Sequence, residues 1–178
     1  TDMLQRYMLG LVGGCLIVSL GLAADVRAST VVAHVLADGE AVELEIPTEI
    51  GLQKERLPLY HSGTIRYFSA GIGEVERTAN YPPFSLKLVF TAGGKPFVSG
   101  VALTVRQAKG GAVLTIPKEH STGPWLFVDL PDGTYDMAAT LGDVSHQVKG
   151  INVRRGHVTT QHIRWAEDRS PALPAQAE

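Results

Sequence analysis

Apolar and polar residues alternate in short runs along the second half of the chain, which is the period of strands that bury one face. In the first run, Phe84, Leu86 and Leu88 are separated by Ser85 and Lys87. Glycine- and proline-rich turns divide the runs at the regular spacing typical of an antiparallel β-sandwich. The seven runs are Phe84–Thr91, Val101–Arg106, Ala112–Ile116, Trp125–Leu130, Tyr135–Thr140, Val144–Lys149 and Val158–Trp165.

These runs predict an all-β fold, a seven-stranded antiparallel β-sandwich over residues 84–166. The stretch from Trp125 to Thr140 is the centre of the pattern, because it holds two runs separated by Pro131-Asp132-Gly133. Proline fixes φ, aspartate tolerates a tight turn and glycine supplies a positive φ. The stretch therefore predicts a β-hairpin with Gly133 at positive φ.

Residues 29–83 carry a weaker version of the same pattern. Thr30–Ala37 and Ala41–Ile46 are apolar-rich runs joined at Asp38-Gly39, which predicts an N-terminal hairpin. Thr48–Ser62 shows no clear period, so we expect a loop there. This segment would be an appendage that packs on the sandwich or is presented to a partner.

The period changes after a short predicted strand at Thr64–Ser69. Ile72, Val75 and Ala79 lie at helical spacing, and Pro82-Pro83 forbids continuation. One short amphipathic helix is therefore predicted over Gly71–Tyr81, where it would close one end of the sheet structure.

Residues 1–28 have the layout of a cleaved signal peptide. Arg6 gives a sparse positive region, Leu9–Leu22 is apolar, and Val26-Arg27-Ala28 provides small residues at the −3 and −1 positions before Ser29. An uncleaved anchor is the alternative, but the apolar run is shorter than the roughly 20 residues that span a bilayer. We therefore expect a periplasmic or secreted protein without a membrane span after cleavage.

Composition narrows the function further. The chain has 178 residues and a net charge of −2, so no basic surface indicates nucleic acid. Its single cysteine, Cys15, lies in the predicted signal peptide, which excludes disulfides and a thiol nucleophile from the mature chain. The tail, residues 167–178, is rich in proline and alanine and is expected to be disordered.

The succession Gly123-Pro124-Trp125, then Leu130 to Tyr135, then a strand ending at Thr140, resembles carboxypeptidase regulatory-like domains. The resemblance covers Phe84–Trp165 and implies a transthyretin-like (prealbumin-like), Ig-like sandwich of seven strands. The whole layout is similar to uncharacterised bacterial periplasmic proteins that carry this domain. Such sandwiches host many roles, so the resemblance implies no particular function. A related branch, the hydroxyisourate hydrolases, ends in Tyr-Arg-Gly-Ser, which this chain lacks, so none of its active-site residues carry over.

Three aromatic residues are candidates for a ligand platform. Trp125, Tyr135 and Trp165 could stack against sugar rings, which gives the carbohydrate-binding alternative. Each also sits at an alternating, core-facing position of a predicted strand. We favour the core interpretation, because large aromatic side chains dominate sandwich interiors.

No cofactor and no metal are predicted. His157 and His162 are five positions apart on one predicted strand, so they point to opposite faces, and His146 shares a face with apolar neighbours. Asp129, Asp132 and Asp136 lie close in sequence but lack the alternating oxygen ligands of a calcium loop.

Catalysis has weak support in the sequence. No serine lies in Gly-x-Ser-x-Gly, and His120-Ser121 are merely adjacent in a polar loop. We therefore expect a non-enzymatic binding or interaction module whose partner is another protein or a glycan. A protein partner would most simply add to an edge strand of the sandwich. The alternatives are a carbohydrate-binding sandwich with exposed aromatics and a cryptic hydrolase.

Overall fold

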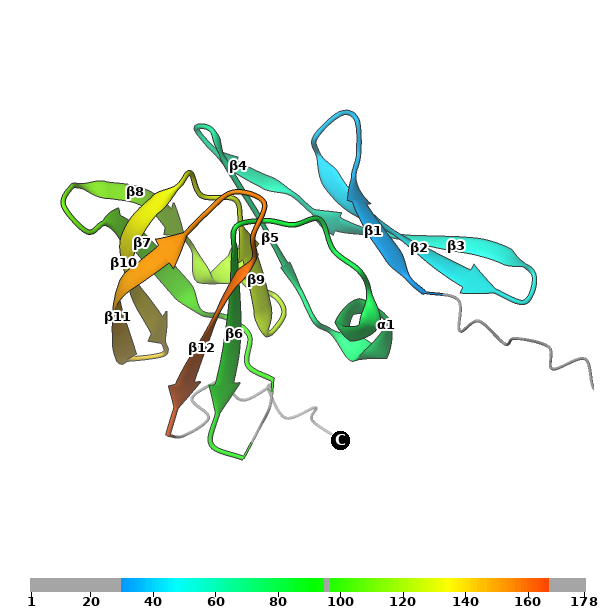
Figure 1. Ribbon diagram of the computed structural model, residues 1–178. Coiled ribbons are helices and arrows are strands. Elements are labelled where there is room, and N and C mark those ends of the chain that lie inside the picture. The colour runs from blue at the N-terminus through cyan, green and yellow to red at the C-terminus, as the bar shows by residue number, and fades with distance from the viewer. Residues whose placement is uncertain (1–29, 95–96, 167–178) are drawn as a thin grey trace, which may run out of the picture.

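The computed structural model describes residues 30–94 and 97–166, and Figure 1 shows their arrangement. The predicted signal peptide and tail lie outside these residues. Within the described ranges, no helix is both long and apolar enough to cross a membrane. The elements are β1 (Val32–Val35), β2 (Ala41–Thr48), β3 (Gly51–Pro58), β4 (Tyr60–Ser62), β5 (Ile65–Ala70), α1 (Gly73–Thr78), β6 (Leu86–Ala92), β7 (Ala102–Gln107), β8 (Ala112–Ile116), a 3₁₀ turn (Lys118–His120), β9 (Trp125–Val128), β10 (Gly133–Leu141), β11 (Val144–Val153) and β12 (Thr159–Trp165).

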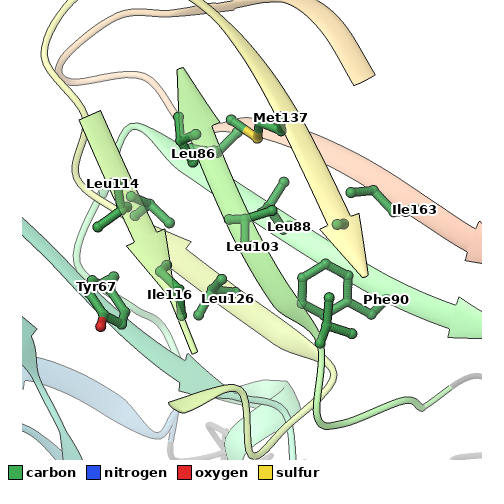
Figure 2. Close-up of a cluster of buried hydrophobic side chains, with 14 of the residues drawn as sticks. Tyr67, Leu86, Leu88, Phe90, Leu103, Leu114, Ile116, Leu126, Met137 and Ile163 are labelled. Carbon is green, nitrogen blue, oxygen red and sulfur yellow. The ribbon is translucent and has the colours of Figure 1, made fainter. Parts of the chain in front are cut away.

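Two sheets pack face to face, and the prediction of an all-β sandwich is confirmed. One sheet has five strands in the order β12-β6-β9-β5-β4, and the other has four in the order β11-β10-β7-β8. Figure 2 shows their side chains meeting in one core, with Leu88 and Leu126 on one side and Leu103 and Met137 on the other. All four are almost completely buried.

The sandwich differs from the predicted one in strand number and direction. The seven predicted strands are β6 to β12, but β4 and β5 join the five-stranded sheet and make nine. Because β5 pairs with β9, the sandwich begins before residue 84. β12 runs parallel to β6, with Thr159 opposite Leu86, so this sheet is not wholly antiparallel. Alternation within a run does not reveal such pairing, because pairing is decided between distant segments.

The predicted hairpin from Trp125 to Thr140 is wrong. β9 belongs to the five-stranded sheet and β10 to the four-stranded sheet, so Pro131-Asp132 crosses between sheets. Gly133 is not in the left-handed region, and it lies against Tyr135, since a Cβ there would be 3.3 Å from the ring. The Tyr135 hydroxyl donates to the carbonyl of Pro131 at 2.8 Å and fixes the crossing.

A third layer covers the outer face of the five-stranded sheet over β5 and β9. Its three strands follow the order β1-β2-β3, and the predicted hairpin at Asp38-Gly39 is confirmed, with Gly39 at φ 73°. Val42 and Leu44 of this layer are buried in a second core. The rings of Phe68 and Phe127 stack there with centroids 4.8 Å apart. In Figure 1 the β2–β3 hairpin extends away from the sandwich.

The predicted loop at Thr48–Ser62 is wrong, because β3 and β4 lie there. β3 is an edge strand with seven of its eight residues exposed, so its sequence lacks the alternation of a half-buried strand.

The predicted helix is confirmed but shorter, at Gly73–Thr78. Val75 and Ala79 pack against the second core, so the helix covers the sheet's outer face with the third layer rather than closing one end.

Two buried serines hold β9 at its ends. The Ser69 hydroxyl accepts from the amide of Gly123 at 2.8 Å and donates to the carbonyl of Trp125 at 3.1 Å. The Ser85 hydroxyl accepts from the amide of Leu130 and donates to its carbonyl, both at 2.8 Å. Backbone groups at the two ends of β9 are thereby satisfied where water does not reach.

We predict that Gly123→Ala destabilises the protein strongly. A Cβ at Gly123 would lie 2.3 Å from the carbonyl oxygen of Ala70, which belongs to the backbone and cannot turn away. Overpacking of this kind costs about 1–3 kcal/mol of unfolding free energy, and occasionally more. Urea denaturation measures the free energy of unfolding of the variant and of the wild type.

The matched control is Gly111→Ala. Gly111 also lies outside the left-handed region, but a Cβ there would meet nothing within 4 Å. Its free energy of unfolding should stay near that of the wild type. Equal stability of the two variants would contradict the close approach at Gly123.

Candidate functional site

A polar groove of about 720 Å³ opens at one end of the sandwich. The crossing between the two sheets, the end of β11 and the turn into β12 form its walls. β10 and β11 pair here, with Gly133 opposite Val153 and Thr134 opposite Asn152. The lining residues are Asp132, Gly133, Thr134, Asn152, Val153, Arg154, His157 and Thr159.

Hydrogen bonds inside the groove fix its walls to one another. The Thr134 hydroxyl donates to the side-chain oxygen of Asn152 at 2.5 Å. The Thr159 hydroxyl donates to the carbonyl of Asn152 at 3.1 Å, which ties β12 to β11. The carboxylate of Asp132 accepts from the backbone amide of Arg155 at 2.7 Å, which ties the crossing to the β11–β12 turn. These contacts hold a preorganised set of polar groups.

A second hollow of about 370 Å³ continues the groove toward the β7–β8 turn. It shares Gly133 and Thr134 with the first and adds Gln107, Ala108 and Lys109. The amide of Ala108 donates to the carbonyl of Thr134 at 2.9 Å, so the turn is fixed to β10. Segments more than 50 positions apart thus meet at one end of the sandwich.

The three predicted platform residues do not come together. Tyr135 and Trp165 are each 1% exposed, in the core between the two sheets. Trp125 packs on the opposite face of the five-stranded sheet, beside the second core. The ammonium of Lys87 lies 3.4 Å from its ring centroid, and a Cβ at Gly71 would be 3.1 Å from its ring atoms. The indole is therefore held by the protein's own groups, and burial lowers the pKa of Lys87.

The His120-Ser121 pair is not arranged as nucleophile and base. His120 Nδ1 is hydrogen-bonded to the Tyr67 hydroxyl at 2.8 Å, and its ring stacks on Tyr60 with centroids 3.7 Å apart. Burial raises the pKa of Tyr67. The Ser121 hydroxyl is completely buried and has no hydrogen-bond partner in the described part of the chain. A substrate could not reach it in this conformation.

The three aspartates considered as calcium ligands each bind a different group of the protein. Asp129 pairs with Arg66 at 2.9 Å, and Asp136 accepts from the amide of Gly150 at 2.9 Å. Asp132 is the only one of the three that lines the groove. They do not converge on one ion site.

The remaining histidines lie apart from one another. His146 is half-buried at the edge of the core, and the centroid of its ring lies 5.2 Å from that of the Trp165 ring. His157 lines the groove, whereas His162 is exposed on β12. His61 is hydrogen-bonded to the carbonyl of Gly39.

One cluster that the sequence did not predict brings possible metal ligands together. Ligand atoms of His34, Glu43 and Glu45 lie within 4.8 Å of one another on β1 and β2. However, the Lys54 ammonium is 2.6 Å from one Glu43 oxygen, and Arg56 is 3.1 Å from the other. Both oxygens of Glu43 are thus paired with the protein's own cations, so the cluster is an ion-pair network. The strand that supplies these cations is β3, which was predicted to be a loop.

The groove was also missed by sequence reasoning, because its residues belong to different strand ends. The alternation of apolar and polar residues weakens at Asn152, Arg154 and Thr159. This weakening indicates that strands end there, but it does not indicate that the strand ends lie close together. No family model, curated protein or solved structure matches the chain.

The Glu43 network gives a prediction about acid stability. Glu43 is 2% exposed, and its hydrogen bond from Lys54, followed by that from Arg56, holds its pKa below the usual range despite the opposing effect of burial. The same bond raises the pKa of Lys54. A lowered carboxyl pKa stabilises the fold above the carboxyl's ordinary pKa, and this contribution is lost as pH falls through the lowered value. Glu43→Gln should therefore lower the melting temperature at pH 7.

The difference from the wild type should narrow as the pH falls through the lowered pKa of Glu43, because the wild-type carboxyl then becomes neutral, as the glutamine already is. Glu45→Gln is the matched control, since Glu45 is 36% exposed and lies 4.0 Å from Lys54. It should change little at either pH. A pH-independent loss in Glu43→Gln would contradict the role of its charge.

Proposed function

We propose that the protein is a secreted, periplasmic, non-enzymatic binding module that holds a polar ligand in the groove at the end of its sandwich. The observation that carries this proposal is the convergence of polar side chains from the sheet crossing, β11 and the β11–β12 turn. We further propose that the sandwich is transthyretin-like, which rests on the resemblance of the Gly123–Tyr135 stretch to carboxypeptidase regulatory-like domains.

The chemistry of the lining supports hydrogen-bonded recognition. Thr134 and Thr159 offer hydroxyls, Asn152 an amide, and Arg154 and His157 nitrogen groups. Such a set matches the hydroxyl and carbonyl groups of a sugar chain or a polar peptide. Because strand pairing and internal hydrogen bonds already order these groups, binding loses little conformational entropy.

The hydrogen bonds of the groove also support binding rather than turnover. Both lining hydroxyls, those of Thr134 and Thr159, donate to Asn152 rather than to His157. A hydroxyl nucleophile needs a base that accepts its proton. The burial of Ser121 likewise disfavours the hydrolase alternative.

The ligand prediction is tested with a panel of oligosaccharides and short polar peptides on the folded protein. Asn152→Ala should weaken binding of any hit by about tenfold, the size expected for one or two lost hydrogen bonds. Titration calorimetry measures the affinity, and melting curves confirm that the variant is folded.

The matched control is Thr115→Ala, an exposed position on β8 outside the groove. It should bind as the wild type does. Equal weakening by both variants would place the ligand elsewhere. Turnover of an ester or peptide probe that disappears in Ser121→Ala would support the hydrolase instead.

The proposed localisation has its own test. Expressed with its N-terminus in a Gram-negative bacterium, the protein should collect in the periplasm and begin at Ser29, as read by mass spectrometry. Ala28→Leu puts a large residue at the −1 position and should block cleavage. An intact N-terminus on wild-type protein in the cytoplasm would contradict secretion.

A further inference from the structure

The groove is surrounded by cations, although the chain as a whole has a net charge of −2. Arg154 lines it, Lys109 lines its continuation, and Arg155 follows directly in the same turn. All three are exposed. In the described part of the chain, the ion pairs within 4.0 Å join Lys54, Arg56 and Arg66 to acids elsewhere, and none involves the groove cations.

The lining contains one acid, Asp132, which offsets only part of this positive charge. One carboxylate oxygen of Asp132 accepts a hydrogen bond from the backbone amide of Arg155 and thereby fixes the β11–β12 turn. Arg154, Lys109 and the neighbouring Arg155 therefore outnumber the single carboxylate of the lining. An excess of one sign of charge around a groove attracts ligands of the opposite sign, and exposed guanidinium groups bind carboxylates through paired hydrogen bonds.

We infer that the ligand of the groove is an acidic oligosaccharide, a sugar chain that carries carboxylates. This inference rests on the proposed function of the groove. Arg154 and Lys109 would bind the carboxylates, while Thr134, Asn152 and Thr159 would meet the sugar hydroxyls. The combination of charge with hydroxyl and amide groups is what an acidic sugar requires and a neutral sugar does not.

The backbone of the groove argues for a sugar over an acidic peptide. Peptides commonly bind by adding a strand to a free edge. Here Gly133 and Thr134 are paired with Val153 and Asn152, and the carbonyl of Thr134 already accepts from Ala108.

The test compares three probes of similar length by titration calorimetry: an oligogalacturonate, its fully methyl-esterified form and an oligoglutamate peptide. The wild type should bind the oligogalacturonate at least about tenfold more tightly than the ester, since the ester lacks the charge-assisted hydrogen bonds. Added salt should weaken binding of the acid and leave the ester nearly unchanged.

Matched variants locate the effect. Arg154→Gln and Lys109→Gln should each lower the affinity for the acid by about fivefold to tenfold and leave the ester unaffected, because each removes one cation. Lys118→Gln is the control, since Lys118 is an exposed lysine of the 3₁₀ turn outside the groove. It should bind both probes as the wild type does.

Each other outcome overturns a different statement. Equal binding of acid and ester, lost in Asn152→Ala, would overturn the preference for acidic sugars and leave the groove as a ligand site. Tighter binding of the oligoglutamate would replace the sugar with an acidic peptide. The proposed function itself would be wrong if neither Asn152→Ala nor Arg154→Gln weakens the binding of any probe, including the oligosaccharides and peptides of the first panel.

Discussion

The structure depends on a five-stranded sheet whose central strands, β5 and β9, are buried on both faces. β9 lies at the centre of the five-stranded sheet, and its consecutive residues point into two different cores. Leu126 and Val128 pack in the sandwich, whereas Phe127 packs beneath the third layer. A strand of this kind has no solvent face, so its sequence is a continuous apolar run. Its backbone is satisfied at both ends by Ser69 and Ser85, because water cannot do so.

The groove follows from that constraint. Once β9 is held in the five-stranded sheet, the chain must leave it at Leu130 and cross to the opposite sheet to start β10. The Tyr135 hydroxyl binds the Pro131 carbonyl and sets the direction of the crossing. Asp132 then reaches the turn between β11 and β12. The hollow between these segments is bounded by the same contacts that join the two sheets, so it does not depend on an independent loop.

The sequence predicted those parts of the fold that local patterns determine. Strands β6 to β12, the Asp38-Gly39 hairpin and the short helix all have a period or a turn that is visible within ten residues. The error between β9 and β10 has a different origin, since their pattern suits a hairpin and a sheet crossing equally well. β3 was missed because an exposed edge strand has no apolar face to display. The groove could not be predicted at all, because Asp132 and His157 come from separate segments that only the tertiary fold brings to one hollow.

The distribution of charge separates the two ends of the molecule. In the third layer, Lys54 and Arg56 are bound to the buried carboxylate of Glu43, so a ligand that captured either cation would leave an uncompensated buried charge. Neither Arg154 nor Lys109 forms an ion pair with another side chain of the described structure. An incoming carboxylate at the groove displaces water and mobile ions rather than an internal partner. The free energy of that contact is therefore available for binding, which makes this end of the sandwich, and not the ion-pair network, the place where an acidic ligand can be recognised.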